Sequence, residues 1–344
     1  MRRTEGRPVE STTVERPEAP ARRKTHGGKK VFAALFLLGV SVVVGCRAVD
    51  SDGFTPVTQL LAFLPWLLVP TGLALLLSAW ARFWIGLGWG MVLLGALAWF
   101  IEPYGETTEP TGARLAELRV MASNVQFGRG TDALIRAVHR DDPDIVFVEE
   151  CQATCLASLR DTFGDLSGKN PAYPYRQVVE GYGSDGSVIL SRFPLKAADP
   201  IPATMGMPGA VADIDGHPVR LRLAHPMPPL PGQLDTWRRE LGALRAYAAA
   251  DSRTPTIVAG DFNASQDHAA FRRILDTGLS DAARLTGADR TPSWPARTTP
   301  ALGAQIDHVL VSAKDFSARG TRFQELSGTD HNAVIVDLTL HRRK

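Results

Sequence analysis

The stretch TIVAGDFN, residues 256–263, joins a run of apolar residues to an acid and an amide. The run is rich in β-branched and small residues, and it predicts a strand over 256–260. Asp261 and Asn263 follow directly after this strand, where side chains at the edge of a sheet can meet a ligand. A simple Asx turn explains the two residues equally well when they are considered alone.

Similar strand-like runs recur on both sides of this stretch, at residues 118–124, 144–149, 187–191, 219–225, 306–312 and 333–340. Helical patterns lie between several of them, at 131–140, 234–250 and 267–275. Strands that alternate with helices predict an α/β domain, with the helices packed outside a sheet core.

Polar residues stand at or just past the ends of these strands: Asn124, Glu150, His225, Asp261, Asn263, Asp307, Asp330 and His331. Carboxylates and carboxamides are ligands that Mg²⁺ prefers, and a His beside a carboxylate can transfer a proton. Together these residue types suit the cleavage of a phosphate ester or phosphoanhydride by an activated water. Taken singly, each residue is explained as well by a turn, an exposed loop or a surface pair.

Five short strings occur in a fixed order: VMASN (120–124), DIVFVEE (144–150), GDFN (260–263), QIDHV (305–309) and TDH (329–331). This ordered set resembles the signature of the endonuclease/exonuclease/phosphatase superfamily, over about residues 118–340. The resemblance implies a DNase I-like fold, a two-sheet β-sandwich flanked by helices in four α/β/β/α layers. It also implies a hydrolase that depends on Mg²⁺, with Mn²⁺ as an alternative.

The resemblance assigns metal binding to Glu150, together with Asn124 and Asp330. The family usually has Gln-Glu where this chain has Glu149-Glu150, and the alignment of the preceding apolar run selects Glu150.

The same resemblance assigns the catalytic work to the remaining residues. Asp261 orients or deprotonates the attacking water, Asn263 polarises a phosphoryl oxygen, and His225 contacts the phosphate. His331 is held in one tautomer by Asp307. Whether Asp261 or His331 is the base stays open.

The first third of the chain has a different composition. Residues 1–30 hold nine Lys or Arg, four Asp or Glu and no aromatic residue, which predicts a disordered basic tail. The next 71 residues contain three apolar stretches and predict transmembrane helices at about 31–48, 57–80 and 83–101. We expect a linker at 102–117 and a catalytic domain at 118–344.

The charges next to the apolar stretches predict an orientation in the plasma membrane. Cations at the end of the tail and Arg82 favour the cytoplasm, so that three spans leave the catalytic domain outside the cell. An alternative is a lipoprotein signal ending at Cys46, although a chain with further spans needs no lipid anchor. An external location also permits Cys151 and Cys155 to form a disulfide.

The expected substrate follows from charge and location. The residues from 112 onward carry 27 Lys or Arg and 27 Asp or Glu, so nucleic acid is not the expected partner. A tethered domain favours a lipid-linked phosphate in the same bilayer. The layout resembles the membrane-bound actinobacterial members of the VanJ type, which implies action on undecaprenyl pyrophosphate and a role in teicoplanin resistance. A nuclease, a phospholipid phosphodiesterase and a non-catalytic binding domain are the alternatives, and no protein partner is predicted.

Overall fold

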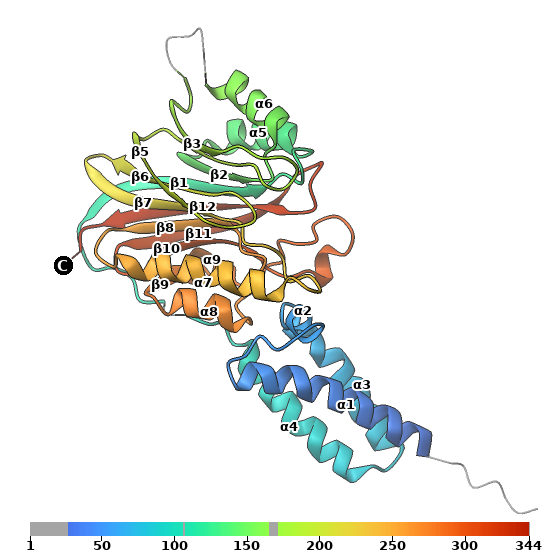
Figure 1. Cartoon of the computed structure of the whole chain (residues 1–344). Coiled ribbons are helices and arrows are strands. Elements are labelled where there is room, and N and C mark those ends of the chain that lie inside the picture. Colours follow the sequence, from blue (N-terminus) through green and yellow to red (C-terminus); the bar gives the residue numbers. More distant parts are fainter. Residues whose placement is uncertain (1–26, 106, 165–170, 344) are drawn as a thin grey trace, which may run out of the picture.

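A computed structural model describes residues 27–105, 107–164 and 171–343. Figure 1 shows two parts: a bundle of helices built from the start of the described chain, and a sandwich of two sheets with helices on its outer faces. The second part is the predicted α/β domain.

Each sheet of the described chain has six strands. The first sheet has the order β11-β12-β1-β2-β4-β3, with β1 at Arg114–Asn124, β2 at Ile145–Glu149, β3 at Tyr175–Val179, β4 at Ser187–Ser191, β11 at Phe316–Glu325 and β12 at Asn332–His341. The second has the order β5-β6-β7-β8-β10-β9, with β5 at Leu195–Ile201, β6 at Met207–Ile214, β7 at His217–Ala224, β8 at Thr256–Asp261, β9 at Leu279–Asp281 and β10 at Asp307–Ser312.

Apolar side chains fill the space between the two sheets, and they come from the inward faces of strands such as β1, β7 and β12. A second apolar cluster joins the first sheet to α5 (Thr131–Asp141) and α6 (Ala153–Phe163). A third joins the other sheet to α7 (Leu234–Ala250) and α8 (Ala269–Leu275). The four layers of Figure 1 are therefore helix, sheet, sheet and helix, which confirms the two-sheet architecture. The short helices α9 (Ala282–Leu285) and η2 (Pro300–Leu302) complete the domain.

The strand directions bring several chain positions to one edge of the sandwich. Strands β1 and β2 run parallel, as do β7 and β8, so their carboxyl ends meet there. Strands β12 and β10 run antiparallel to β1 and β8, so their first residues lie at the same edge. All the strand-end polar residues of the sequence are thereby placed on one rim.

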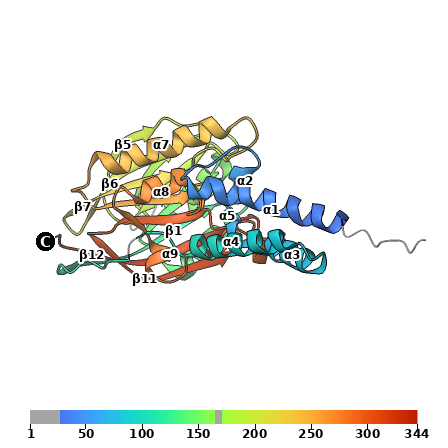
Figure 2. The ribbon, with the colours of Figure 1, turned by 90° about the horizontal axis from the view of Figure 1, so that it is seen from below.

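The bundle consists of α1 (Gly27–Ala48), α3 (Leu68–Trp80) and α4 (Trp84–Ile101), with α2 (Val57–Leu61) and η1 (Leu64–Leu67) before α3. Seen from below in Figure 2, these helices extend away from the sandwich. Among the described residues, α1 and α4 are the helices long and apolar enough to cross a membrane, by length and composition.

The prediction that residues 57–80 form the middle one of three spanning helices is wrong. This segment is broken after α2, and Pro65, which has no amide hydrogen to donate, stands at the start of η1. The remaining apolar helix, Leu64–Trp80, is shorter than a full span.

Two predicted boundaries also shift. Helix α1 begins at Gly27, so residues 27–30 are helical, while the rest of the predicted tail lies outside the described residues. Strand β1 begins inside the predicted linker, because Arg114 pairs with His341 of β12. Cys46 is half-buried in α1 and packs against the core of the bundle.

Candidate active site

Glu150 directly follows β2 and lies in a left-handed conformation, with φ 56°. A non-glycine residue in this region is strained, and such strain gathers at functional positions. Its carboxylate accepts hydrogen bonds from the amide of Phe127, at 2.9 Å, and from the Nδ2 of Asn124, at 3.2 Å. The turn thus aims the Glu150 carboxylate into the rim of the sandwich.

Asn124, at the end of β1, connects the two sheets. Its Nδ2 also donates to the Oδ2 of Asp261, at 3.2 Å, while its Oδ1 accepts from the amide of Gln126, at 2.9 Å. The side chain therefore presents its amide group to both carboxylates. In this arrangement Asn124 holds the two acids in place, and its metal-binding role stays a prediction.

Asp261 ends β8, and its Oδ1 accepts from the backbone amide of Asn263, at 2.8 Å. Asp261 therefore forms an Asx turn and also belongs to the candidate site. The turn depends on Gly260, whose φ of 139° and close approach to the Ala224 carbonyl exclude a side chain. The Nδ2 of Asn263 donates to the carbonyl of Pro226, at 3.0 Å.

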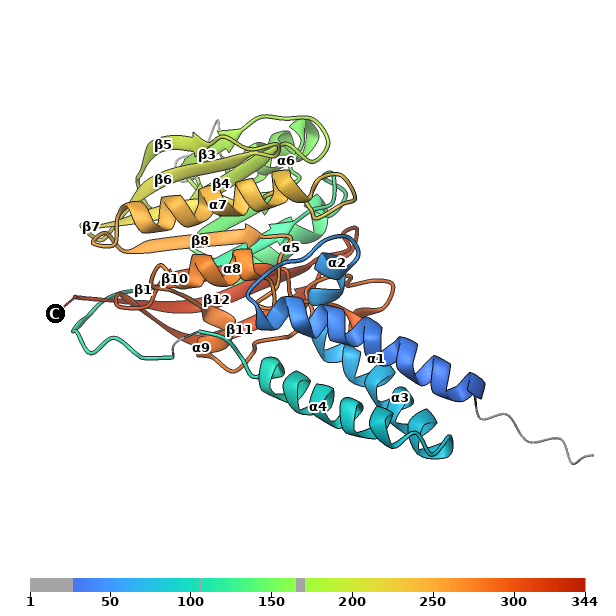
Figure 3. The ribbon, with the colours of Figure 1, turned by 60° about the horizontal axis from the view of Figure 1, so that its bottom comes forward.

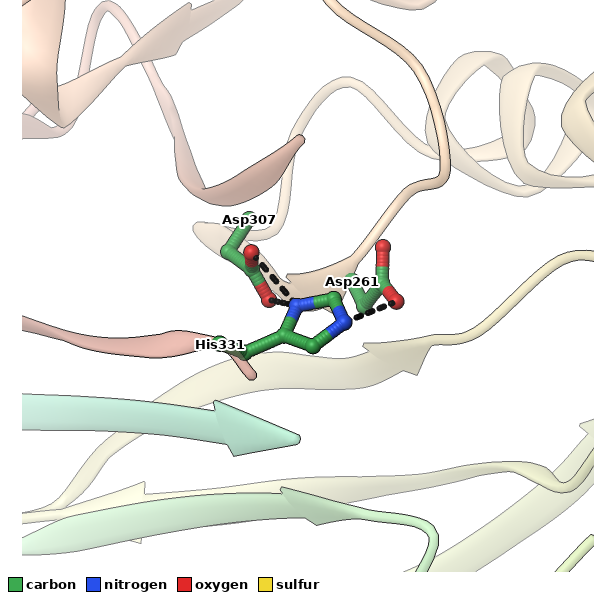
Figure 4. A group of neighbouring side chains, drawn as sticks. All are labelled: Asp261, Asp307 and His331. Atoms are coloured by element: carbon green, nitrogen blue, oxygen red, sulfur yellow. Dashed lines mark hydrogen bonds and ion pairs between the residues drawn. The ribbon is translucent and has the colours of Figure 1, made fainter. Parts of the chain in front are cut away.

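His331 lies between two carboxylates, as Figure 4 shows. Its Nδ1 is 3.0 Å from Asp307 Oδ2, and its Nε2 is 3.8 Å from Asp261 Oδ2. Burial lowers the pKa of His331, but the charges of Asp307 and Asp261 outweigh burial and raise it to about 10. Burial and the nearby charge of Asp307 raise the pKa of Asp261 to about 7. His331 is thus a proton donor at neutral pH, and Asp261 can accept a proton there.

His225 directly follows β7 and is buried, with its Nε2 3.9 Å from Glu150 Oε1. Burial, together with the positive charge of His331, lowers the pKa of His225 to about 3. The ring is therefore neutral at physiological pH, which suits it to hydrogen bonding with a phosphate.

Asp330 lines the same cavity, and its Oδ2 accepts from the indole nitrogen of Trp294, at 3.1 Å. Trp294 belongs to a loop with no strand or motif signal, so the sequence had offered no reason to include it. Thr329 also supports the site, because its hydroxyl donates to the carbonyl of Asn124, at 2.8 Å, and accepts from the amide of His331.

The donor atoms of this rim fit a divalent cation. Single ligand atoms of Asp261, Asp307 and His331 lie within 4.8 Å of one another, and Glu150 shares the Asn124 amide with Asp261. Hard carboxylate oxygens of this kind are the donors that Mg²⁺ and Mn²⁺ take. Glu150 and Asp330, the two carboxylates predicted as metal ligands, both line the cavity and would hold the ion, whereas Asp307 is engaged by His331.

The cavity above these residues has a volume of about 510 Å³. It is lined by Glu150, His225, Asp261, Asn263, Asp330 and His331 on one side. Asn124 and Asp307 join the group through their hydrogen bonds to Asp261 and His331. The structure therefore brings together all eight residues that the sequence had singled out.

Residues 121–331 match the sequence profile of the Endonuclease/Exonuclease/phosphatase family. The chain belongs to this family. The match spans the described site from the middle of β1 to His331, and the family is typically dependent on divalent metals. No curated protein sequence matches the chain.

Solved structures with the family fold resemble the sandwich. A humanized TDP2 of D. rerio is 17% identical, with a TM-score of 0.53, over 64% of this chain and 98% of that chain. The endonuclease/exonuclease/phosphatase of Beutenbergia cavernae is 19% identical, with a TM-score of 0.52, over 67% of this chain and 73% of that chain. The 3′ phosphatase NExo of Neisseria, solved with a product DNA hairpin, is 17% identical, with a TM-score of 0.52, over 64% and 98%. At these identities the likeness establishes the fold alone.

Proposed function

We propose that the protein is a membrane-anchored phosphoesterase that hydrolyses a lipid-linked phosphate or pyrophosphate, such as undecaprenyl pyrophosphate, outside the cell. One observation carries the proposal: the cavity of the family site is lined on its other side by Gln59, Ala62 and Phe63, which belong to the helical bundle. If α1 and α4 cross the bilayer, the site lies at the membrane surface, where lipid phosphates are located.

The lining of the cavity favours a lipid over a nucleic acid. Among the described residues that line it, three are carboxylic acids and none is Lys or Arg. Neutralising a phosphate backbone requires several cations along the contact surface. A single phosphate head group needs only the cation of the family site.

Two observations support an external catalytic domain. Lys29, Lys30 and Arg82 lie at the end of the bundle away from the sandwich, where the Lys29 ammonium stacks on the ring of Trp80. Cations flanking apolar helices favour the cytoplasmic side. The family domain carries a disulfide between Cys151 and Cys155, which forms and persists in oxidising compartments.

The residues of the rim support a direct hydrolytic step. A divalent cation held by Glu150 and Asp330 would neutralise phosphoryl oxygens. Asp261 lines the same cavity and is placed to accept the proton of the water that attacks phosphorus. His331, protonated and held by Asp307, donates to the leaving oxygen or the phosphoryl group. Neutral His225 and the side-chain amide of Asn263 donate hydrogen bonds to the phosphate.

The test uses the full chain in detergent micelles, with farnesyl pyrophosphate as substrate and free phosphate as the readout. We expect release with Mg²⁺, none with EDTA, and none from Glu150→Ala. Glu117→Ala, which removes an exposed Glu of β1, is the matched control and keeps activity. Cleavage of plasmid DNA or of sphingomyelin in place of the pyrophosphate would overturn the substrate, and no hydrolysis of any of them would favour a binding domain.

A role in glycopeptide resistance belongs to the same proposal. Cells that produce the wild-type chain should tolerate more teicoplanin than cells that produce Glu150→Ala. Equal tolerance in the two strains would remove this role while leaving the enzymatic reaction intact.

A further inference from the structure

The connection between α1 and α3 is held against the catalytic domain by polar contacts. The carboxylate of Asp52, which is buried, accepts from the amides of Ala269 and Ala270 at the start of α8, at 2.6 and 3.2 Å. The carbonyl of Thr58 bonds to the ring Nε2 of His268, at 2.8 Å. These bonds fix α2 against the domain, next to the edge that carries the site (Figure 3).

The C-terminal end of α4 is held in the same way. The guanidinium of Arg290 donates to the carbonyls of Phe100 and Ile101 and forms an ion pair with Asp267, at 2.7 Å. The bundle is thus tied to the sandwich at two places, and both involve buried or half-buried groups. A wall of the cavity that comes from the bundle is therefore a fixed part of the site.

Apart from Gln59, whose side-chain amide donates to the Pro229 carbonyl, the wall is apolar. Ala62 and Phe63, both half-buried, face the cavity from the bundle, and Met205, Met227 and Leu230 line it from the catalytic domain. Leu230 is 50% exposed. A hydrophilic substrate gains nothing from these side chains, whereas an alkyl or isoprenoid chain is stabilised by removal from water.

Apolar side chains are also exposed on the bundle outside the cavity. After Phe63, the chain exposes Trp66 and Leu68, then Val69 at 63% and Leu76 at 70%. Exposed apolar residues on a bundle of this kind face lipid when the helices lie in a bilayer. The bundle therefore presents apolar side chains both at the cavity and along η1 and α3.

We infer that Ala62, Phe63 and Met227 form a binding site for the first part of the substrate's hydrocarbon chain, a single isoprenoid-type chain next to its phosphate. The cavity of about 510 Å³ has the size of a site for one small ligand, so the head group and the first units of the chain occupy it. The remainder of the chain stays in the membrane. This inference rests on the proposed function, and it adds that the bundle selects the substrate as well as anchoring the enzyme.

The experiment compares two pyrophosphates that share a head group and differ in chain length, farnesyl and isopentenyl pyrophosphate. The readout is the ratio of kcat/KM for the longer to that for the shorter substrate, measured with the full chain in one detergent. We expect the wild type to prefer the longer chain. Phe63→Ala should reduce the ratio about tenfold or more, since a single methylene in an apolar pocket is worth at least this much.

Three further variants complete the design. Met227→Ala, on the opposite wall, should reduce the same ratio even if Phe63→Ala disturbs the bundle. Phe63→Leu should keep most of the preference, because it preserves apolar volume. Val92→Ala, at an exposed position of α4, is the matched control and should leave the ratio at the wild-type value.

The outcomes separate the two proposals. A wild-type enzyme that cleaves both pyrophosphates with equal efficiency, or whose ratio is unchanged in Phe63→Ala and Met227→Ala, overturns the chain-binding site and leaves the phosphoesterase standing. A wild-type enzyme that cleaves neither overturns the proposed function, and the chain-binding site with it.

Discussion

Replacing Asp307 by Asn tests the charge pair at the centre of the site. The substitution keeps the size of the side chain but removes the charge that bonds to His331 Nδ1 at 3.0 Å. A rise of the His331 pKa from 6.5 to about 10 corresponds to at most about 5 kcal/mol. Asp261 supplies part of this free energy. The share of Asp307 is about 2 kcal/mol, the contribution of a hydrogen bond to a charged group. We expect Asp307→Asn to lower the melting temperature of the metal-free protein by about 4–8 °C at neutral pH.

The dependence on pH has a definite sign. The folded protein holds a proton on His331 that the unfolded chain releases above its pKa of 6.5, so this contribution is complete below that pH. It is lost as pH rises through about 10. Thermal melting in EDTA between neutral pH and about pH 10 should therefore show a wild-type stability that falls with pH. The melting curves of wild type and Asp307→Asn should converge at the alkaline end.

A difference in melting temperature between the two proteins that stays constant over this pH range would refute the reasoning, because it would mean that His331 is neutral throughout. Asp337→Asn is the control, since it removes an exposed acid of β12 that pairs with Arg119 at the surface. Its effect on stability should be within about 1 kcal/mol at every pH.

Three other changes have defined outcomes. Addition of Mg²⁺ should raise the melting temperature of the wild type but not of Glu150→Ala, because a ligand stabilises only a fold that binds it; an equal rise in both would remove Glu150 from the metal site. Replacing Cys151 and Cys155 by Ser should cost about 2 kcal/mol in denaturant unfolding, and a reducing agent should affect the wild type but not this variant. Trp294→Phe should lower kcat/KM about fivefold by removing the hydrogen bond to Asp330, and an unchanged value would show that this bond does not position the acid.

The elements that the sequence predicted are those whose residues carry a strong local pattern. Strands such as β2 and β8 are buried along their whole length, and their continuous apolar runs reveal them. Strand β11 escaped notice because it is an edge strand with partly exposed residues and little alternation. Its position beside β12 is decided by pairing over the sheet, which a local pattern does not report.

The broken middle helix has a similar explanation. Residues 57–80 are mostly apolar and carry no charged side chain, so composition alone suggests one span. The break is set by Pro65 and by the contacts of Asp52 and Thr58 with α8, which lies more than 200 residues further along the chain. For the same reason the sequence placed the eight polar residues at the site but offered no signal for Phe63, whose role comes from the docking of the bundle.

The pair Glu149-Glu150 shows how strand geometry gives two neighbouring acids different surroundings. Successive side chains of a strand point to opposite faces, so Glu149, at the end of β2, points between the sheets and is fully buried. Burial, reinforced by the charges of Asp307 and Asp261, raises the pKa of Glu149 well above its usual range. This shift favours the protonated, neutral form of Glu149, which resembles the Gln that the family usually has there. Glu150 leaves the strand in a left-handed turn, and its carboxylate reaches the cavity. The extra acid thus points away from the cavity, and Glu150 is the one of the two whose carboxylate reaches it.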